Sequence, residues 1–242
     1  MLLVGVGMGP GDPELVTVKA VRVLQSADRI FVPVLTPDEA GYAEATVRAH
    51  VGHDRIERLV FALNERSDRG RRERHWDAAG ERVAAFLGVG LGATAAFATI
   101  GDPNVYSTFS YLAQTVRALL PDVDLDTVPG ITAAQDLAAR SGTPLAEGVE
   151  SLTLLPLASG VEGLAAALEK PGSVVTYKSG RHVTGVVEAV RRAGRLHGAV
   201  FGARLGLAGQ MIRPLAAVDG GSAPYLSTVL VPARRGGRGG AL

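Results

Sequence analysis

The stretch Ile100-Gly101-Asp102-Pro103-Asn104-Val105-Tyr106-Ser107 joins two apolar segments of different kinds. The run before it, residues 94–100, has the length and apolar character of a buried strand. After it, apolar residues recur at the spacing of a helix that buries one face, at Phe109, Leu112, Val116 and Leu119. Strand-to-helix turns line the crevice where ligands bind in an open α/β sheet, so the stretch predicts an α/β fold with a binding site at this turn.

The first three residues of this turn suit a binding loop. Gly101 lets a ligand approach the backbone closely, Asp102 supplies an acceptor for hydroxyl or ammonium groups, and Pro103 fixes the turn. The same residues also fit a purely structural turn in which Asp102 is the N-cap of the following helix. The residues of the turn alone leave both interpretations open.

The composition narrows the class of protein. The chain has 242 residues, of which 47% are hydrophobic, and this is enough for one large or two small domains. A formal net charge of +1 gives no electrostatic case for binding nucleic acid or an anionic membrane. The absence of cysteine excludes disulfides, thiolate catalysis and cysteine-ligated metals. His75 has no second ligand at metal-binding spacing on one helix face, so we predict no metal site.

Two further segments bear on the membrane and on nucleic acid. Residues 83–101 carry no charge over nearly the length of a spanning helix, but their glycines favour a helix end, a turn and a buried strand. Charges of both signs crowd between residues 64 and 82 with only Trp76 as an aromatic, which indicates a solvated helix start.

The N-terminus lacks the basic lead of a signal peptide, so we expect a cytoplasmic protein.

Two glycine clusters approach the dinucleotide-binding fingerprint, but neither satisfies it. In residues 5–13, Pro10 stands where the third glycine is required, and proline has no N–H to offer a phosphate. This predicts a rigid, close-packed loop. Residues 88–93 match the pattern but follow a helix and precede a strand, which is the reverse of the required order. An NAD-dependent dehydrogenase is therefore not favoured.

Apolar periodicity predicts strands and helices that alternate along the chain. Strands are expected at residues 2–6, 30–34, 94–100, 152–157, 174–177, 199–203 and 226–231. Helices are expected at residues 14–26, 73–87, 161–168 and 182–193, after residue 107, and from Thr132 to Arg140. In the first helix the inward residues should be Leu15, Val18, Val21 and either Val23 or Leu24.

The acidic run at residues 121–126 looks like the end of a first lobe. We therefore expect one α/β domain at residues 1–121 and a second at residues 122–233. The arginine- and glycine-rich residues 234–242 predict a flexible tail.

Three motifs, in this order and spacing, resemble those of the tetrapyrrole methylases, S-adenosylmethionine-dependent enzymes that methylate corrin and sirohaem precursors. The motifs are Val6-Gly7-Met8-Gly9-Pro10-Gly11-Asp12-Pro13, Gly101-Asp102-Pro103 with Tyr106-Ser107, and Val128-Pro129-Gly130-Ile131-Thr132-Ala133-Ala134. The resemblance extends over nearly the whole chain. Within the family the chain is most similar to the precorrin-2 methyltransferases that act at carbon 20. The features that carry this are Pro33, where sirohaem-type members have an acidic residue, His75-Trp76 and Pro224-Tyr225-Leu226-Ser227.

The resemblance implies a two-lobed α/β fold with the active site in the cleft between two α/β domains, and a homodimer. It implies methyl transfer from S-adenosylmethionine, leaving S-adenosylhomocysteine, to carbon 20 of precorrin-2 to give precorrin-3A in cobalamin biosynthesis, without a metal. By position, the cofactor-binding residues would be Pro10, Ile100, Gly101, Asp102, Val105, Tyr106, Thr132, Ala133 and Lys178. At Lys178 relatives make a backbone contact, so its side chain need not matter.

The tetrapyrrole substrate carries many carboxylates, so basic residues are expected beside it. The candidates are Lys178, Arg181 and Arg204, with Asp12 as a further substrate-binding candidate. Each basic residue is alternatively an ordinary surface charge, and Arg204 stands where some relatives have glycine. No catalytic base is evident. One alternative is a tetrapyrrole methylase that acts at another ring carbon or on a cobalt-bearing or diphthamide-type substrate. The other is a nucleotide-binding or scaffold protein of the same fold that has lost catalysis and at most binds S-adenosylmethionine.

Overall fold

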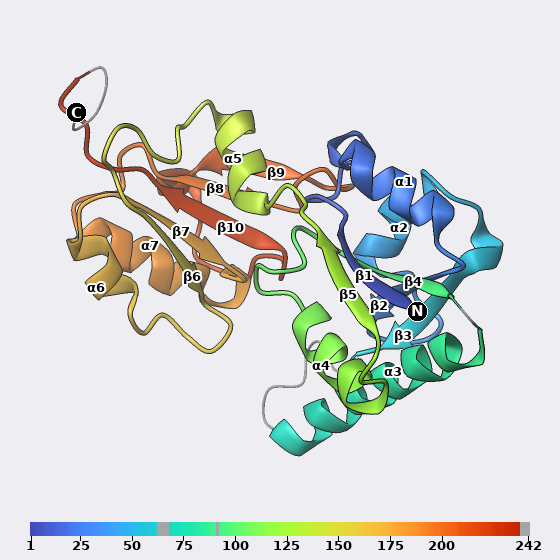
Figure 1. Ribbon diagram of the computed structural model, residues 1–242. Helices are drawn as coiled ribbons and strands as arrows, with labels where there is room; N and C mark the ends of the chain where they lie inside the picture. The colour runs from blue at the N-terminus through green and yellow to red at the C-terminus, as the bar shows by residue number, and fades with distance from the viewer. Residues whose placement is uncertain (62–67, 91, 238–242) are drawn as a thin grey trace. The chain divides into compact units, whose positions relative to one another are not determined.

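The computed structural model describes residues 1–61, 68–90 and 92–237 of the chain (Figure 1). It divides into two compact units, Met1–Thr132 and the part that begins at Ala133. Each unit holds a five-stranded sheet covered by helices. The predicted two-lobed α/β fold is confirmed.

The sheet of unit 1 is wholly parallel, with the strand order β3-β2-β4-β1-β5. Its strands are β1 (Leu2–Gly7), β2 (Arg29–Val34), β3 (Ile56–Val60), β4 (Thr94–Thr99) and β5 (Asp124–Val128). The carboxyl ends of parallel strands meet at one edge of a sheet. Because β1 lies between β4 and β5, the loops that follow these three strands are neighbours.

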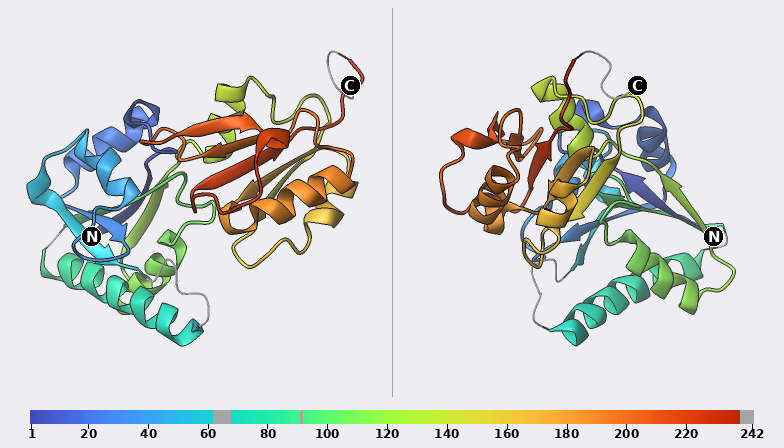
Figure 2. Two further views of the ribbon diagram at one scale, coloured as in Figure 1. Left: turned by 180° about the vertical axis from the view of Figure 1, so that it is seen from behind. Right: turned by 90° about the vertical axis from the view of Figure 1, so that its left-hand side faces the viewer.

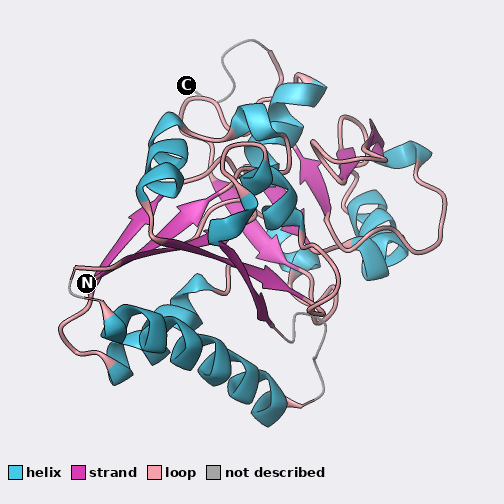
Figure 3. Ribbon diagram, turned by 90° about the vertical axis from the view of Figure 1, so that its right-hand side faces the viewer, coloured by secondary structure: helices cyan, strands magenta, loops and turns pink. Residues whose placement is uncertain are grey.

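Helices cover both faces of this sheet (Figure 3). One face packs against α1 (Val18–Ser26) and α2 (Tyr42–Arg48), and the other against α3 (Arg69–Val89) and α4 (Phe109–Leu119). Along β1 the side chains alternate between the two cores, with Val4 in the first and Leu3 in the second. Gly5 lets α4 approach closely, since a Cβ there would lie 2.6 Å from the ring of Phe109.

The sheet of unit 2 is mixed, with the strand order β6-β7-β10-β8-β9. Its strands are β6 (Leu152–Pro156), β7 (Ser173–Tyr177), β8 (Val200–Ala203), β9 (Met211–Pro214) and β10 (Ser227–Val231). β6 and β7 are parallel, and the other pairs are antiparallel. The helices α6 (Leu164–Glu169) and α7 (Val183–Arg192) cover one face, and α5 (Ala133–Ser141) covers the other (Figure 2).

All seven predicted strands are present within one or two residues, but three others were not predicted: β3, β5 and β9. α2 was also not predicted. The prediction of one helix over residues 14–26 is wrong. A short 3₁₀-helix, Pro13–Leu15, comes first, and α1 begins only after Thr17, whose hydroxyl accepts a hydrogen bond from the N–H of Ala20. Consequently Val18 is 73% exposed, whereas Leu24 is buried as expected.

One expected domain boundary and one expected inward-facing residue differ from those in the structure. The acidic run contains the start of β5, an edge strand that pairs with β1, so unit 1 extends to Thr132 rather than to residue 121. Asp124 and Asp126 face solvent there while Leu125 is half-buried, a period of two that the charges obscured. In α4, Leu119 is exposed at the last turn instead of facing inward.

The residues expected to begin a flexible tail are bound to the rest of unit 2. The guanidinium of Arg235 donates to both carboxylate oxygens of Glu150, at 2.8 and 2.6 Å, and Arg234 donates to the carbonyl of Ala193. These side-chain bonds hold an irregular backbone in place without secondary structure. Residues 238–242 lie outside the described residues, as do residues 64–67 of the predicted charged helix start.

A buried ion-pair network connects α2 to β3. The carboxylate of Glu44, which is fully buried, accepts hydrogen bonds from Arg58 at 2.8 and 3.0 Å and from Arg48 at 2.8 Å. Burial raises the pKa of Glu44, but the hydrogen bonds from Arg58 and Arg48 outweigh it and hold the pKa below its ordinary value of 4.5. Arg58 also donates to the carbonyl of Pro37. The network therefore fixes α2 and the chain before it against the sheet.

We expect Glu44→Gln to lower the free energy of unfolding at neutral pH by about 1–3 kcal/mol, because the amide no longer carries the charge that both guanidinium groups contact. The pKa of Glu44 is lower in the folded chain, so its contribution is complete above the unfolded pKa and is lost as the pH falls through the folded value. The difference between wild type and variant, measured by urea unfolding, should narrow on acidification below about pH 5.

The matched control is Glu188→Gln. Glu188 also bonds two arginines, Arg191 and Arg192, but its side chain is 43% exposed, and solvent weakens such pairs. Glu188→Gln should therefore change the urea midpoint of unfolding much less than Glu44→Gln does. A difference for Glu44→Gln that stays constant or widens in acid would contradict the assignment.

Candidate functional site

The three motif loops meet at the carboxyl ends of β1, β4 and β5. The N–H of Gly101 donates to the carbonyl of Gly9 at 2.7 Å, and the N–H of Met8 donates to the carbonyl of Thr99 at 2.9 Å. A Cβ on Gly7 would lie 2.5 Å from the nitrogen of Gly130, and one on Gly130 would lie 2.1 Å from the carbonyl oxygen of Gly101. The backbones of the three loops are therefore in direct contact, which only glycine permits.

Asp102 ties two of these loops together. Its Oδ1 accepts a hydrogen bond from the N–H of Asn104 at 2.7 Å, and its Oδ2 accepts one from the N–H of Gly130 at 2.9 Å. The residue is only 9% exposed. The N-cap interpretation of Asp102 is wrong, because α4 begins at Phe109, whose N–H bonds the hydroxyl of Ser107. Asp102 thus orients the backbone of the site.

The loop after β4 combines open space with backbone strain. Gly101 has φ +70°, and no described atom lies within 4 Å of the place that its Cβ would occupy. Tyr106, in the same loop, is 41% exposed and has φ +52°, a conformation that costs a residue other than glycine about 1–3 kcal/mol. Open space beside a rigid glycine backbone is what a ligand needs in order to contact main-chain atoms.

The loop after β1 is rigid and close-packed, as the sequence predicts. Pro10 is buried, and the carbonyl of Gly11 accepts a hydrogen bond from the hydroxyl of Thr46 at 3.3 Å. The carboxylate of Asp12 accepts one from the N–H of Glu14 at 3.0 Å, so Asp12 caps the 3₁₀-helix. These bonds hold the loop against α2 and its own following turn.

In unit 2, two candidate residues lie at the same end of the sheet. Lys178 follows β7 and Arg204 follows β8, and the start of β10 lies between those strands. Both have left-handed backbone, with φ +59° and +50°. The N–H of Arg204 donates to the carbonyl of Leu226, and the ammonium of Lys178 lies 5.9 Å from the ring centroid of Tyr225.

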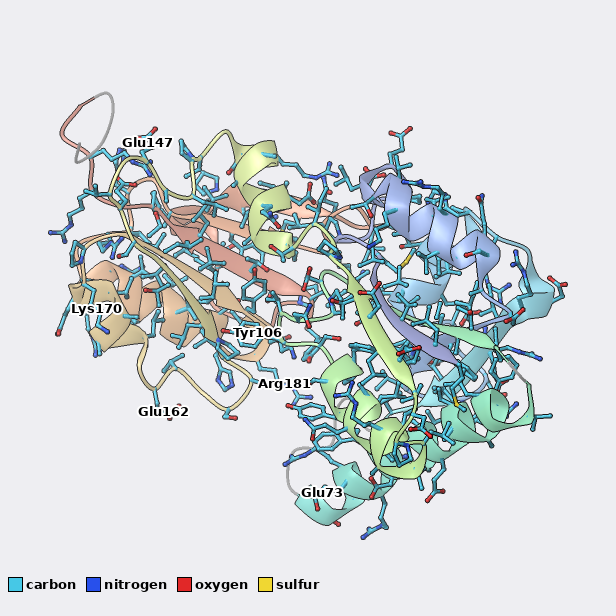
Figure 4. The ribbon with its side chains drawn as sticks, in the orientation of Figure 1. Glu73, Tyr106, Glu147, Glu162, Lys170 and Arg181 are labelled. Carbon is cyan, nitrogen blue, oxygen red and sulfur yellow. The ribbon has the colours of Figure 1, made fainter. Side chains whose placement is uncertain are left out.

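Arg181 lies near the same end, in the 3₁₀-helix Gly180–His182 (Figure 4). That helix packs on the chain before β10, since a Cβ on Gly180 would lie 2.2 Å from the carbonyl oxygen of Pro224. Within residues 1–61, 68–90 and 92–237, the side chains of Arg181 and Arg204 make no hydrogen bond or ion pair. Lys178, Arg181 and Arg204 are called the basic cluster below.

The structure thus divides the predicted site residues between the units. Unit 1 contributes Pro10, Asp12, Ile100, Gly101, Asp102, Val105, Tyr106 and Thr132, all on the loops after β1, β4 and β5, and unit 2 contributes Ala133, Lys178, Arg181 and Arg204. Gly7 and Gly130 were not predicted as site residues, although the motifs contain both. In the described ranges, no group of three or more histidine and acidic residues could hold a metal ion.

Comparison with known proteins identifies the class that these loops define. The model of the tetrapyrrole (corrin/porphyrin) methylases matches residues 2–218. The chain belongs to this family.

Two relatives match over nearly their full length. The precorrin-2 C(20)-methyltransferase of Sinorhizobium sp is 32% identical over 237 residues, which are 95% of this chain and 94% of the relative. The cobalt-precorrin-2 C(20)-methyltransferase of Salmonella typhimurium is 30% identical over 234 residues, 95% of each chain. The cobalamin biosynthesis protein CobIJ of Mycobacterium tuberculosis is 34% identical over 238 residues, but the chain spans only about half of it, 46%.

Solved structures agree on the fold. A putative cobalamin synthesis related protein (CobF) from Corynebacterium diphtheriae superposes with a TM-score of 0.69 at 21% identity, over 96% of this chain and 99% of that one. Uroporphyrin-III C-methyl transferase from Thermus thermophilus, complexed with S-adenosyl homocysteine, gives 0.66 at 19% identity, over 95% and 97%. In the described part of the chain, no helix has the length and apolar composition needed to cross a membrane.

We expect Asp102→Ala to leave the N–H groups of Asn104 and Gly130 without their acceptor, and to lower the free energy of unfolding by about 1–3 kcal/mol for each. Asp102→Asn keeps one carbonyl oxygen and should fall between wild type and alanine. Urea unfolding followed by the fluorescence of Trp76, the single tryptophan, measures the series. Equal stability of all three proteins would show that Asp102 does not tie the loops.

Proposed function

We propose that this protein transfers a methyl group from S-adenosylmethionine to carbon 20 of precorrin-2. The observation that carries the proposal is the convergence of the three motif loops, with open space at Gly101, in a chain that belongs to the tetrapyrrole methylases. The names of two near-full-length relatives support carbon 20. A homodimer, which the resemblance implies, and a cytoplasmic location belong to the same proposal.

The residues present fit a bound S-adenosylmethionine. Gly101 offers main-chain atoms beside open space, and Asp102 and the glycine contacts hold the neighbouring backbone rigid. The predicted contact residues remain Pro10, Ile100, Gly101, Asp102, Val105, Tyr106, Thr132, Ala133 and Lys178. Both oxygens of Asp102 already accept backbone N–H bonds, so we assign it to positioning the loops first.

The chemistry favours positioning over acid–base catalysis. S-adenosylmethionine, when bound, supplies an already electrophilic methyl group, and a reduced tetrapyrrole offers an electron-rich bridging carbon. Alignment of two reactants contributes about 7–11 kcal/mol. A general base contributes a rate factor of about 10²–10⁴, which is roughly 3–5 kcal/mol. Rigid loops that orient the reactants are therefore the larger contribution. We assign no base, and the proton from carbon 20 goes to solvent or to a carboxylate.

The basic cluster is proposed to bind substrate carboxylates. Arg181 and Arg204 make no ion pair with described residues, and Arg204 keeps a strained backbone where glycine would be relaxed. An arginine in a strained backbone is explained if its side chain makes a contact that glycine cannot make, here to a substrate carboxylate. Asp12 accepts a hydrogen bond from its own turn, so a substrate contact by Asp12 has less support.

Methylation of the cobalt-bearing form of precorrin-2 is the second candidate function. The relatives from Sinorhizobium and Salmonella are named for the metal-free and the cobalt-bearing substrate, and they are almost equally similar to this chain, at 32% and 30% identity. Cobalt-precorrin-2 is therefore the alternative substrate.

The first test titrates the protein with S-adenosylhomocysteine by calorimetry. We expect micromolar binding that Gly101→Ala weakens at least about tenfold, because the added methyl fills the open space where the ligand contacts the loop. Gly92→Ala is the matched control. Gly92 also has a left-handed backbone, φ +77°, and no described atom near its Cβ position, but it lies in the turn before β4. Both variants should lose about 1–2 kcal/mol of stability.

The outcomes separate the parts of the proposal. If both variants weaken binding equally, the ligand does not contact Gly101. If wild type does not bind S-adenosylhomocysteine, the proposal of methyl transfer is overturned. The methylated carbon is then found by incubation with S-adenosylmethionine carrying a ¹³C-methyl group and with precorrin-2 or cobalt-precorrin-2. Carbon NMR of the product should show one new methyl at carbon 20, and a methyl at another carbon would overturn the regiochemistry alone.

Arg204→Gly tests the basic cluster. Glycine relaxes the backbone at φ +50°, so stability should change by less than about 1 kcal/mol. The KM for the tetrapyrrole should rise about tenfold with kcat nearly unchanged, since a charge-assisted contact to a carboxylate is lost. Steady-state kinetics measures both constants. The control variant is Arg192→Gln, which removes a surface arginine of α7 and should leave the KM unchanged. An unchanged KM would make Arg204 an ordinary surface charge.

A further inference from the structure

A pocket lies in unit 2, at the end of the sheet opposite the basic cluster. Its volume is about 480 Å³, within the range of small-molecule sites, roughly 300–1,000 Å³. The walls come from the connection between α6 and β7, the end of α7 and the segment after β10. The connection precedes β7 and Lys178 follows it, so the five residues of β7, at about 3.3 Å each, separate the two places. Lys170 and Arg181 mark these two places in Figure 4.

A buried guanidinium forms part of the pocket wall. Arg195 is 6% exposed and donates to the carbonyls of Leu168, Gly172 and Pro232 at 3.1, 2.6 and 2.8 Å. These bonds use three of its five N–H donors, and Nε has no partner among the described residues. No described carboxylate pairs with Arg195. A buried cation compensated only by carbonyl dipoles is costly, so the wall favours an anion.

Two more cations line the same pocket. Arg234 donates to the carbonyl of Ala193 at 2.6 Å, and neither Arg234 nor Lys170 makes an ion pair with a described residue. Burial first, and then the charge of Arg234, lower the pKa of Arg195, which is the direction for a cation without a counter-charge. Glu169 is the single carboxylate in the lining, so its ionisable groups leave a net charge of +2.

We propose that this pocket binds a phosphate group, either as free phosphate or as the phosphoryl group of a metabolite. A phosphate group carries about −1.5 to −2 charges at neutral pH, which matches the net charge of the lining better than a single carboxylate does. Its several oxygens can accept from guanidinium and ammonium groups at once. This site is independent of methyl transfer, because none of its residues belongs to the motif loops or the basic cluster.

The test titrates the full chain with inorganic phosphate, ribose 5-phosphate and, as a control, ribose. Binding is followed by calorimetry and by the ¹H–¹⁵N signal of the Arg195 side chain. The principal variant is Lys170→Gln combined with Arg234→Gln, since both residues are exposed and should not be needed for folding. Arg192→Gln removes an exposed arginine outside the pocket, and Arg204→Gly removes one from the basic cluster.

We expect saturable phosphate binding that shifts the Arg195 signal and that the double variant weakens about tenfold or more. Arg192→Gln and Arg204→Gly should leave it unchanged. Tighter binding of ribose 5-phosphate than of phosphate would indicate a metabolite, and equal binding would indicate free phosphate. No saturation below about 10 mM would overturn the site. The site would also be overturned if Arg192→Gln or Arg204→Gly weakened phosphate binding as much as the double variant does, or if phosphate did not shift the Arg195 signal.

Discussion

The hydrogen bond from the N–H of Gly130 to the carboxylate of Asp102 joins the loop after β5 to the loop after β4. It forms where the backbones of Gly7, Gly101 and Gly130 approach so closely that no Cβ could be added at Gly7 or Gly130. Parallel strands bring the three loops to one edge, and this bond together with the one from Gly101 to Gly9 makes them a single rigid surface. The order β4-β1-β5 is therefore a requirement of the site as well as of the core.

Backbone strain is concentrated at the same kind of position in both units. Tyr106 follows β4, Lys178 follows β7 and Arg204 follows β8, and these are the three residues other than glycine described with positive φ. Each needs surroundings that hold it, which the start of β10 supplies for Arg204 through the carbonyl of Leu226. Such strain persists where the side chain serves a purpose that glycine would not. The strain distinguishes these three residues from the other residues of the described loops.

The basic cluster and the pocket around Arg195 in unit 2 use arginine differently. At the basic cluster, Arg181 and Arg204 stand at the surface with their donors available. In the pocket, Arg195 is buried and donates to carbonyls of three separate segments, so it also stabilises the fold.

The place of Pro33 in unit 1 also follows from its hydrogen-bonding needs. The residue lies on β2 beyond the last pair with β4, where β2 pairs with β3 alone, and this tolerates a residue without an N–H.

The sequence by itself determined the α/β class, the seven strands with clear apolar runs and the family, because glycine and proline at fixed spacings report local backbone needs. It could not reveal β5, since charges on the solvent side of an edge strand mask the period of two. It could not assign Asp102 either, because a capping carboxylate and one that bonds Gly130 look alike along the chain. Only the tertiary structure decided these points, along with the pocket around Arg195, since each depends on contacts between residues far apart in the sequence.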